Sequence, residues 1–166
     1  MTNFVYHSKF SISLFVMVTF LASILIWLMC FGLLVLWVID GKIKKETVIH
    51  AIFSCALAWG IAETIKIIFP TLRPFQSQNL IPLTLTIPGD GAFPSGHTAL
   101  AFALATTILK HDRKIGILYL IMAGLVGVAR IMAHVHYPID IFGGAVIGVI
   151  ISQLTSSKHF VRLLNR

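Results

Sequence analysis

The chain has 166 residues, of which 57% are hydrophobic and only 11% are charged, and its mean hydropathy is +0.92. Soluble globular domains are about 45–50% apolar and about 25% charged, so this composition is typical of a membrane protein and excludes a disordered chain. The two cysteines are too few for a disulfide framework. The formal net charge of +7 would favour a nucleic-acid partner in a soluble protein, so the positions of the charges have to be considered next.

Five apolar segments follow one another along the chain. The first lies in the uncharged stretch between Lys9 and Asp40, which exceeds the roughly 20 residues that one membrane span needs. A proline-rich loop over 70–94 separates the second segment from the third. We predict an all-α integral-membrane helical bundle of about five transmembrane helices, forming a single domain over 1–166. The expected spans are 11–38, 47–69, 95–110, 115–134 and 138–154.

The basic residues indicate an orientation. With five spans, the loops 40–46 and 110–114 and the tail 156–166 share one side of the membrane. These three segments hold nine of the 13 basic residues, and the positive-inside rule assigns that side, with the C-terminus, to the cytoplasm. The N-terminus is then expected outside. Most of the basic excess is therefore explained by topology, and we expect no nucleic-acid partner.

A second group of ionisable residues collects toward the opposite, extracytoplasmic side. Charged groups within membrane spans are costly and usually face a bundle interior or a water-filled cavity. A single lysine or arginine there is explained by a side chain that reaches the membrane interface. Six side chains at one depth from four segments are not explained that way, and they are Lys66, Arg73, His97, Arg130, His136 and Asp140.

The residue types in this group suit a phosphate ligand. Lys66, Arg73 and Arg130 supply three positive charges, and arginine can hold phosphate oxygens in a bidentate fork. The sequence Pro94-Ser95-Gly96-His97 predicts a helix start with Ser95 as the N-cap. Free backbone N–H groups in such a first turn bind anions, and Gly96 lets a ligand approach closely. An ordinary capped helix explains this tetrapeptide alone equally well.

The histidines suit phosphoryl transfer. His136 and Asp140 are four residues apart at a predicted helix start, so the carboxylate can fix the tautomer of the imidazole and leave its other nitrogen free to attack. His97 is available as an acid. No carboxylate cluster for a metal ion is evident, so a metal-free reaction without a cofactor is expected. Glu63, three residues before Lys66, is expected to pair with it.

Three spaced motifs over 66–140 resemble the signature of the type 2 phosphatidic acid phosphatase superfamily, which the soluble vanadium haloperoxidases share. The motifs are Lys66-x6-Arg73-Pro74, then Pro94-Ser95-Gly96-His97, then Arg130-x5-His136-x3-Asp140. The third usually opens with Ser-Arg, where this chain has Ala129-Arg130. Family members in membranes often have six spans, one more than predicted here.

The resemblance implies a helical bundle that hydrolyses lipid phosphate esters through a phosphohistidine. By position, His136 is then the nucleophile, Asp140 its orienting partner and His97 the acid, while the phosphate oxygens are held by Lys66, Arg73, Ser95, Gly96 and Arg130. We expect a polyprenyl (undecaprenyl) diphosphate phosphatase of a bacterial inner membrane, with its active site outside the cytoplasm and membrane lipids around it. Phosphatidate, phosphatidylglycerophosphate and lipid A phosphate are alternative substrates. A lipid phosphotransferase and a non-catalytic lipid-binding protein are alternative functions.

Two further expectations concern packing. Small residues recur at helix-packing intervals, at Gly124 and Gly127 and again at Gly144 and Gly148, and they predict close contact between helices of the chain. The loop 75–93 carries several apolar residues and no charge before Asp90. It is expected either to lie on the membrane interface and gate the access of lipid, or simply to pack on the bundle.

Overall fold

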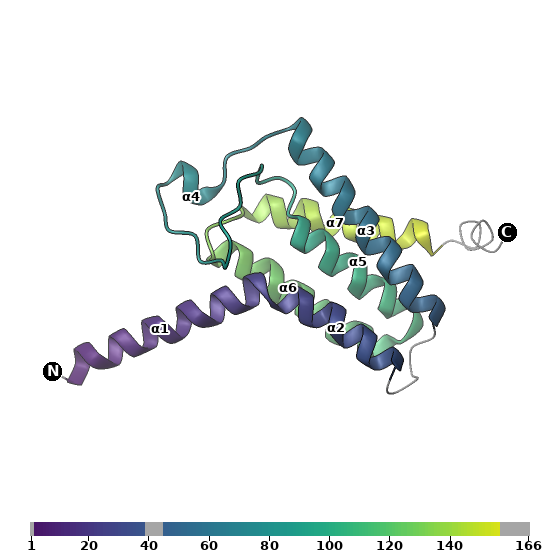
Figure 1. Ribbon diagram of the computed structural model, residues 1–166, viewed down its shortest axis with the longest axis horizontal. Coiled ribbons are helices and arrows are strands. Elements are labelled where there is room, and N and C mark those ends of the chain that lie inside the picture. The colour runs from purple at the N-terminus through teal and green to yellow at the C-terminus, as the bar shows by residue number, and fades with distance from the viewer. Residues whose placement is uncertain (1, 39–44, 157–166) are drawn as a thin grey trace.

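The computed structural model describes residues 2–38 and 45–156, and over these residues it contains helices and no strand. The predicted all-α class is confirmed. In chain order the helices are α1 (Thr2–Ser23), α2 (Leu25–Val38), α3 (Lys45–Ile68), α4 (Pro74–Ser77), α5 (Gly96–His111), α6 (Arg113–Met132) and α7 (Pro138–Thr155). Figure 1 shows α1 projecting from the bundle, with α4 and its neighbouring loops gathered at one end.

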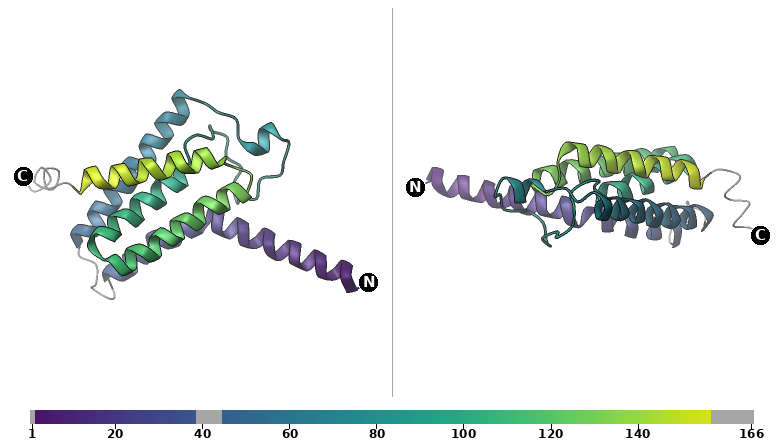
Figure 2. Two further views of the ribbon diagram at one scale, coloured as in Figure 1. Left: turned by 180° about the vertical axis from the view of Figure 1, so that it is seen from behind. Right: turned by 90° about the horizontal axis from the view of Figure 1, so that it is seen from above.

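Helix α5 forms the centre of the bundle and packs against α3, α6 and α7 (Figure 2). Its alanines are fully buried, as at Ala99 and Ala103, and their small size lets the neighbouring helices approach closely. A Cβ atom on Gly144 of α7 would lie 2.5 Å from the carbonyl oxygen of Ser95, and one on Gly148 would lie 2.4 Å from that of Ala99. The predicted close packing at these two glycines is confirmed.

The glycines of α6 differ from each other. A Cβ atom on Gly127 would lie 2.7 Å from Cγ2 of Ile141, so this position packs tightly, as predicted. The prediction was wrong for Gly124, where a Cβ atom would meet nothing within 4 Å. The two residues are three apart, and one of them faces α7 while the other faces open space.

The first predicted span is broken. Instead of one long helix over 11–38, α1 and α2 meet at Ile24 with a bend of 55°. Kinks arise where a side chain inserts into the ladder of helix hydrogen bonds. Here Nη1 of Arg130 donates to the carbonyl oxygen of Ala22 (3.1 Å), and Oγ of Ser23 accepts from the backbone N–H of Leu85 (3.2 Å). The sequence around the bend contains neither proline nor glycine, so the cause lies in these tertiary contacts.

The described helices identify an integral membrane protein. Helices α3, α6 and α7 are long and apolar enough to span a membrane, and the bent pair from Ile12 to Val38 adds a fourth span if it is counted as one. Only 33–39% of the residues in the three apolar windows are buried, so most of them are available to lipid. Helix α5 has 16 residues, fewer than the roughly 20 of a full span. The number of five spans therefore stays a prediction, and most of the loop 40–46 and of the tail lies outside the described residues.

Candidate active site

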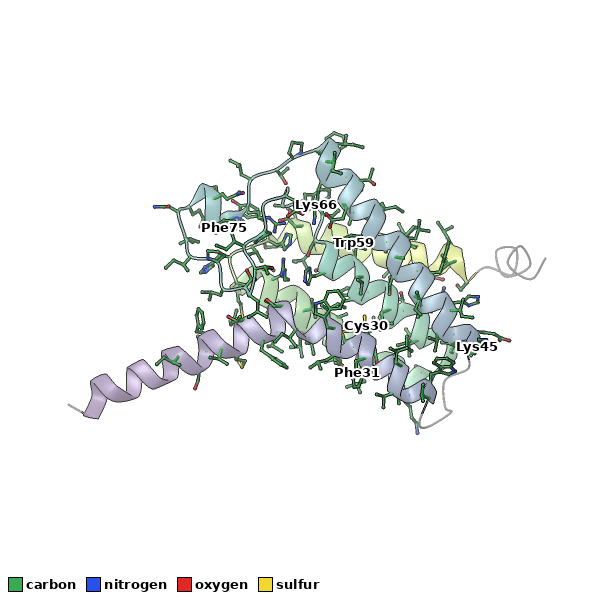
Figure 3. The ribbon with its side chains drawn as sticks, viewed as in Figure 1. Cys30, Phe31, Lys45, Trp59, Lys66 and Phe75 are labelled. Carbon is green, nitrogen blue, oxygen red and sulfur yellow. The ribbon has the colours of Figure 1, made fainter. Side chains whose placement is uncertain are left out.

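The residues singled out in the sequence converge at the end of the bundle that carries α4. Lys66 lies in the last turn of α3, Arg73 precedes α4, Arg130 lies in the last turn of α6, and His136 lies between α6 and α7. Figure 3 shows Lys66 at this end of the bundle, with Trp59 on the same helix. The four side chains are almost fully buried, at 1–6% exposed, although each is polar or charged. Side chains of this kind are rarely buried unless they are paired, so their partners define the site.

Local sequence rules place two of these elements. Residues before a proline favour an extended backbone, and both Arg73 before Pro74 and Tyr137 before Pro138 adopt it directly ahead of a helix. At the start of α7, Oδ2 of Asp140 accepts a hydrogen bond from the backbone N–H of Tyr137 (2.8 Å), as the third residue of a capping box does. Asp140 is thus fixed at the start of α7, where its side chain is buried.

Arg73 uses all five of its N–H donors. Nε donates to the backbone oxygen of Asp90 (3.0 Å), and Nη2 donates to Oδ1 of Asp90 (2.9 Å) and to the oxygen of Gly91 (3.0 Å). Nη1 donates to the oxygen of Val135 (2.8 Å) and faces Nε2 of His136 at 3.2 Å. The guanidinium is therefore held rigidly, and only its Nη1 side is directed at the imidazole.

Lys66 lies between two carboxylates. Its Nζ is 2.7 Å from Oε1 of Glu63 and 2.7 Å from Oδ2 of Asp90, which leaves one of its three N–H donors for a ligand. Burial of Asp90 alone would raise the pKa of this carboxyl, but the hydrogen bond and charge of Lys66 and the charge of Arg73 lower it to about 2. The predicted pairing of Glu63 with Lys66 is present. Asp90 was not among the predicted site residues, because nothing in its sequence neighbourhood shows that the loop folds back onto α3.

Arg130 has more donors left than Arg73. One Nη1 bond goes to Ala22, Nη2 faces Nε2 of His136 at 3.5 Å, and the buried Nε has no partner. A buried donor without a partner costs about 1–3 kcal/mol, and a phosphate oxygen would satisfy it. Arg130 is consequently the guanidinium best prepared to accept a ligand.

His136 is oriented by its surroundings. Its Nε2 faces two arginines, which can only donate, so Nε2 carries the lone pair and the ring proton is on Nδ1. Nδ1 lies 3.4 Å from Oδ2 of Asp140, which is longer than an ordinary hydrogen bond, and in unliganded sites such bonds are often long. Burial lowers the pKa of His136, with a further contribution from the charges of Arg130 and Arg73 and an opposing one from Asp140.

The first turn of α5 also borders the site. Ser95 is the N-cap residue by position, but its side chain makes no cap bond, and its hydroxyl accepts from that of Thr98 (3.1 Å) instead. The predicted helix start with Ser95 as the N-cap residue is confirmed, without a cap bond from its side chain. The backbone N–H of Ser95 donates to the oxygen of Asp140 (3.0 Å), which ties this turn to α7. The N–H groups of the first turn of α5 remain available to an anion.

His97 lies in the first turn of α5, within electrostatic range of Arg130, His136, Lys66 and Arg73. It also lines an apolar cavity of about 390 Å³, whose other walls come from α2, α3 and α5. A second cavity of about 200 Å³ adjoins the first along Cys55 and Leu100 and extends toward Leu104. We call the two together the α2–α3 groove. It is lined by Ile26, Trp27, Cys30, Leu33, Leu34, Ala51, Ile52, Cys55, Ala56, Trp59, Gly96, His97, Leu100 and Leu104.

The remaining candidates have other positions. His134 has a positive φ of 60° in the turn after α6, and its Nδ1 lies 3.1 Å from the carbonyl oxygen of Ile81, so it shapes this turn. No three histidine, cysteine or acidic side chains lie together as a metal site within the described ranges. Glu63 and Asp90 both contact Lys66 and hold cationic side chains.

Comparison with known proteins identifies the family. A model of the PAP2 superfamily matches residues 47–163, a range that includes Lys66, Arg73, His97, Arg130, His136 and Asp140. The chain belongs to the PAP2 superfamily. The predicted resemblance is confirmed.

Two relatives from Bacillus species match most of the chain. The chain is 31% identical over 133 residues to the bacitracin transport permease protein BcrC of Bacillus licheniformis. The aligned region covers 80% of this chain and 66% of that protein. Over 122 residues the chain is 31% identical to the undecaprenyl-diphosphatase BcrC of Bacillus subtilis, which covers 74% of this chain and 63% of the relative. The matched region thus spans slightly less than two thirds of each relative.

Solved PAP2 structures have the same helical arrangement. LpxE of Aquifex aeolicus superposes with a TM-score of 0.68 at 31% identity, over 86% of this chain and 83% of that one. The PAP2 type phosphatidylglycerolphosphate phosphatase of Bacillus subtilis superposes with a TM-score of 0.62 at 20% identity, over 93% and 78%, and shows the fold alone.

Proposed function

We propose that the protein hydrolyses a lipid phosphate or diphosphate ester without a metal ion, through a phosphohistidine formed on His136. The observation that carries this proposal is the position of Nε2 of His136. It bears a lone pair, faces the guanidinium groups of Arg73 and Arg130 at 3.2 and 3.5 Å, and has Asp140 behind its other nitrogen. A nucleophile surrounded by donors for the oxygens of the group it attacks is the arrangement that phosphoryl transfer needs.

The reaction has two steps. Nε2 of His136 attacks the terminal phosphorus, the bond from phosphorus to the leaving oxygen breaks, and His97 gives that oxygen a proton. Arg130, the Nη1 side of Arg73, the third N–H of Lys66 and the first turn of α5 hold the non-bridging oxygens. Water then attacks the phosphohistidine and passes a proton to His97, which releases orthophosphate and restores both histidines. Asp140 stabilises the positive charge on the imidazole during attack.

The preferred substrate in this proposal is a polyprenyl diphosphate such as undecaprenyl diphosphate. The named activity of the Bacillus subtilis relative supports this choice. The α2–α3 groove supports an apolar substrate more generally, because it begins at His97 and Gly96 and is walled by apolar side chains. A chain attached to the leaving oxygen can lie there. Phosphatidate, phosphatidylglycerophosphate and lipid A phosphate share the headgroup chemistry and are the alternatives to be tested.

The site is proposed to face the outside of a bacterial inner membrane. Support comes from the distribution of charge, because nine of the 13 basic residues belong to segments expected on the side opposite to the site. Substrate would then reach the site from the outer leaflet.

The decisive experiment measures phosphate release by detergent-purified protein in EDTA from polyprenyl diphosphate, phosphatidate, phosphatidylglycerophosphate and lipid A phosphate. His136→Ala is the control and should lower the rate by several orders of magnitude. EDTA-resistant release that disappears in this variant supports the proposal, and the lipid that reacts fastest identifies the substrate. Labelled phosphate that moves to a second lipid would instead establish a phosphotransferase. Lipid that binds without any turnover would establish a binding protein.

A further inference from the structure

Asp90 connects two cations of the site, Lys66 and Arg73, the second of which faces the nucleophile. One carboxylate oxygen is 2.7 Å from Nζ of Lys66, and the other is 2.9 Å from Nη2 of Arg73. Lys66 and Arg73 come from separate segments, and Asp90 forms an ion pair with each of them. Its side chain is 41% exposed, unlike the buried cations, so it lies at the mouth of the site and solvent can reach it.

The position of Asp90 is fixed by the backbone on either side. The N–H of Ala92 donates to the oxygen of Thr71 (3.0 Å), and the N–H of Phe93 donates to Oγ1 of Thr71 (2.9 Å). At Gly91 a Cβ atom would lie 3.2 Å from the oxygen of Lys66, so the loop passes very close to the end of α3. The carboxylate is therefore held in place and does not reach the cations by chance.

The bonds to Asp90 decide which part of Arg73 faces the reaction. The Nε and Nη2 side, which could grip a phosphate in a bidentate fork, is taken up by Asp90 and Gly91. Only the Nη1 side is directed at Nε2 of His136. Asp90 thus does not occupy the position of the phosphate. It binds Arg73 on the side of the guanidinium away from His136 and so sets the direction in which Nη1 points.

Charge is balanced in the same arrangement. Three cations, Lys66, Arg73 and Arg130, are accompanied by three carboxylates, which are Glu63, Asp90 and Asp140. A phosphate dianion in a buried site with an uncompensated charge of +3 would be bound very strongly. Such binding would hold the substrate and the product alike, and binding both ground states more tightly does not speed the reaction.

We propose that Asp90 is a positioning residue that limits the affinity of the site for phosphate and keeps Lys66 and Arg73 directed at the transferred group. This inference rests on the proposed phosphatase function, and it adds a residue outside the three motifs. Removal of the carboxylate frees a second N–H donor of Lys66, which stays paired with Glu63, and adds net positive charge, so phosphate binds more tightly. The same change releases Lys66 from its fixed direction, so turnover slows. A residue that served stability alone would not tighten the binding of an anion.

Asp90→Asn is the most informative substitution, because asparagine separates the two bonds. Its amide oxygen still accepts from Nη2 of Arg73, while its NH₂ group faces the ammonium of Lys66, which it cannot bind. We expect orthophosphate to bind about three- to tenfold more tightly, because one negative charge is removed near a partly solvated site. We expect kcat to fall about tenfold. Binding is measured by calorimetric titration of the detergent-purified protein with orthophosphate, and kcat and KM by phosphate release.

Two further variants serve as controls. Asp90→Glu keeps the charge and moves the carboxylate by one methylene group, so phosphate affinity should stay near that of the unmodified protein while kcat falls. Asp112→Asn removes the same charge at the N-cap of α6, at the opposite end of the bundle, where asparagine caps equally well. It should change neither quantity.

The outcomes separate the two proposals. Unchanged or weaker phosphate binding by Asp90→Asn, in protein that stays monodisperse, would overturn the role of Asp90. If that variant does not fold, Asp90→Glu decides the matter, because an altered phosphate affinity with unchanged kcat contradicts the proposal. An unmodified protein that neither binds orthophosphate nor releases it from any lipid would instead remove the phosphatase function itself.

Discussion

At the scale of single residues, the pair His136 and Asp140 carries a kinetic prediction. Asp140→Asn keeps an oxygen for the imidazole but removes the charge that stabilises the imidazolium during attack. We expect kcat to fall about 10²- to 10⁴-fold with little change in KM, by analogy with the effect of that substitution in serine proteases. Steady-state kinetics in detergent, with orthophosphate affinity as a second readout, test this. A loss that appears mainly in KM would mean that Asp140 helps to bind substrate.

The pH dependence follows from the burial of His136. Its pKa is lowered below the ordinary value of about 6.5, so the attacking nitrogen keeps its lone pair in mildly acidic solution. An ordinary histidine would be about 90% protonated at pH 5.5. We therefore expect the yield of radiolabelled phosphohistidine in a rapid-quench experiment to be similar at pH 5.5 and 7.5. A tenfold loss at pH 5.5 would contradict this assignment.

The same lowered pKa affects stability. Because the folded protein binds fewer protons at His136 than the unfolded chain, the free energy of unfolding decreases as the pH falls below about 6.5. Asp90 contributes in a lower range, because its pKa of about 2 lies below that of the unfolded carboxyl. Its stabilising contribution is complete above about pH 4 and is lost as the pH falls toward 2.

At the scale of secondary-structure elements, the two glycine pairs offer a matched test. Gly144→Ala places a Cβ atom 2.5 Å from the oxygen of Ser95 and must push α7 away from the start of α5, whereas Gly124→Ala enters open space. We expect Gly144→Ala to lower the thermal unfolding temperature and the activity together, and Gly124→Ala to leave both unchanged or to stabilise by up to about 1 kcal/mol. Equal effects of the two substitutions would mean that the α5–α7 contact is not tight.

The α2–α3 groove gives a second prediction at this scale. Ala56 lines the groove, while Leu57, one residue further along α3, is not among its lining residues. Ala56→Phe should reduce hydrolysis of a long-chain lipid phosphate about tenfold or more, because one extra aromatic ring blocks part of the cavity. Hydrolysis of a water-soluble phosphate ester without a chain should persist. Leu57→Phe should change neither rate, and equal loss on both substrates in Ala56→Phe would argue against a chain in the groove.

At the scale of the whole molecule, the orientation in the membrane can be measured directly. The charge distribution predicts a cytoplasmic C-terminus. A reporter enzyme that is active only outside the cytoplasm should therefore give no signal when it is fused to the C-terminus, and a cytoplasmic reporter should give a strong one. Signals of the opposite kind would place the site on the cytoplasmic side.

The fold class and most of the site could be predicted because charges in an apolar chain are informative. Lys66, Arg73, Arg130 and His136 stand out in a chain with 11% charged residues, and the structure brings them together. Asp90 could not be predicted, since its role depends on a loop that folds back onto α3. The bend at Ile24 was missed for a similar reason, because its contacts come from residues more than 60 positions away.

The contact between Arg130 and Ala22 also determines what mutagenesis can reveal. The acceptor is a main-chain oxygen, so every amino acid at position 22 offers the same atom. A scan of single substitutions would record the size tolerated at this fully buried alanine and would not detect the bond. Replacing the amide linkage by an ester at the neighbouring position would weaken the carbonyl as an acceptor without altering any side chain. The acceptor in this hydrogen bond can therefore be tested by changing the backbone and not by substituting residue 22.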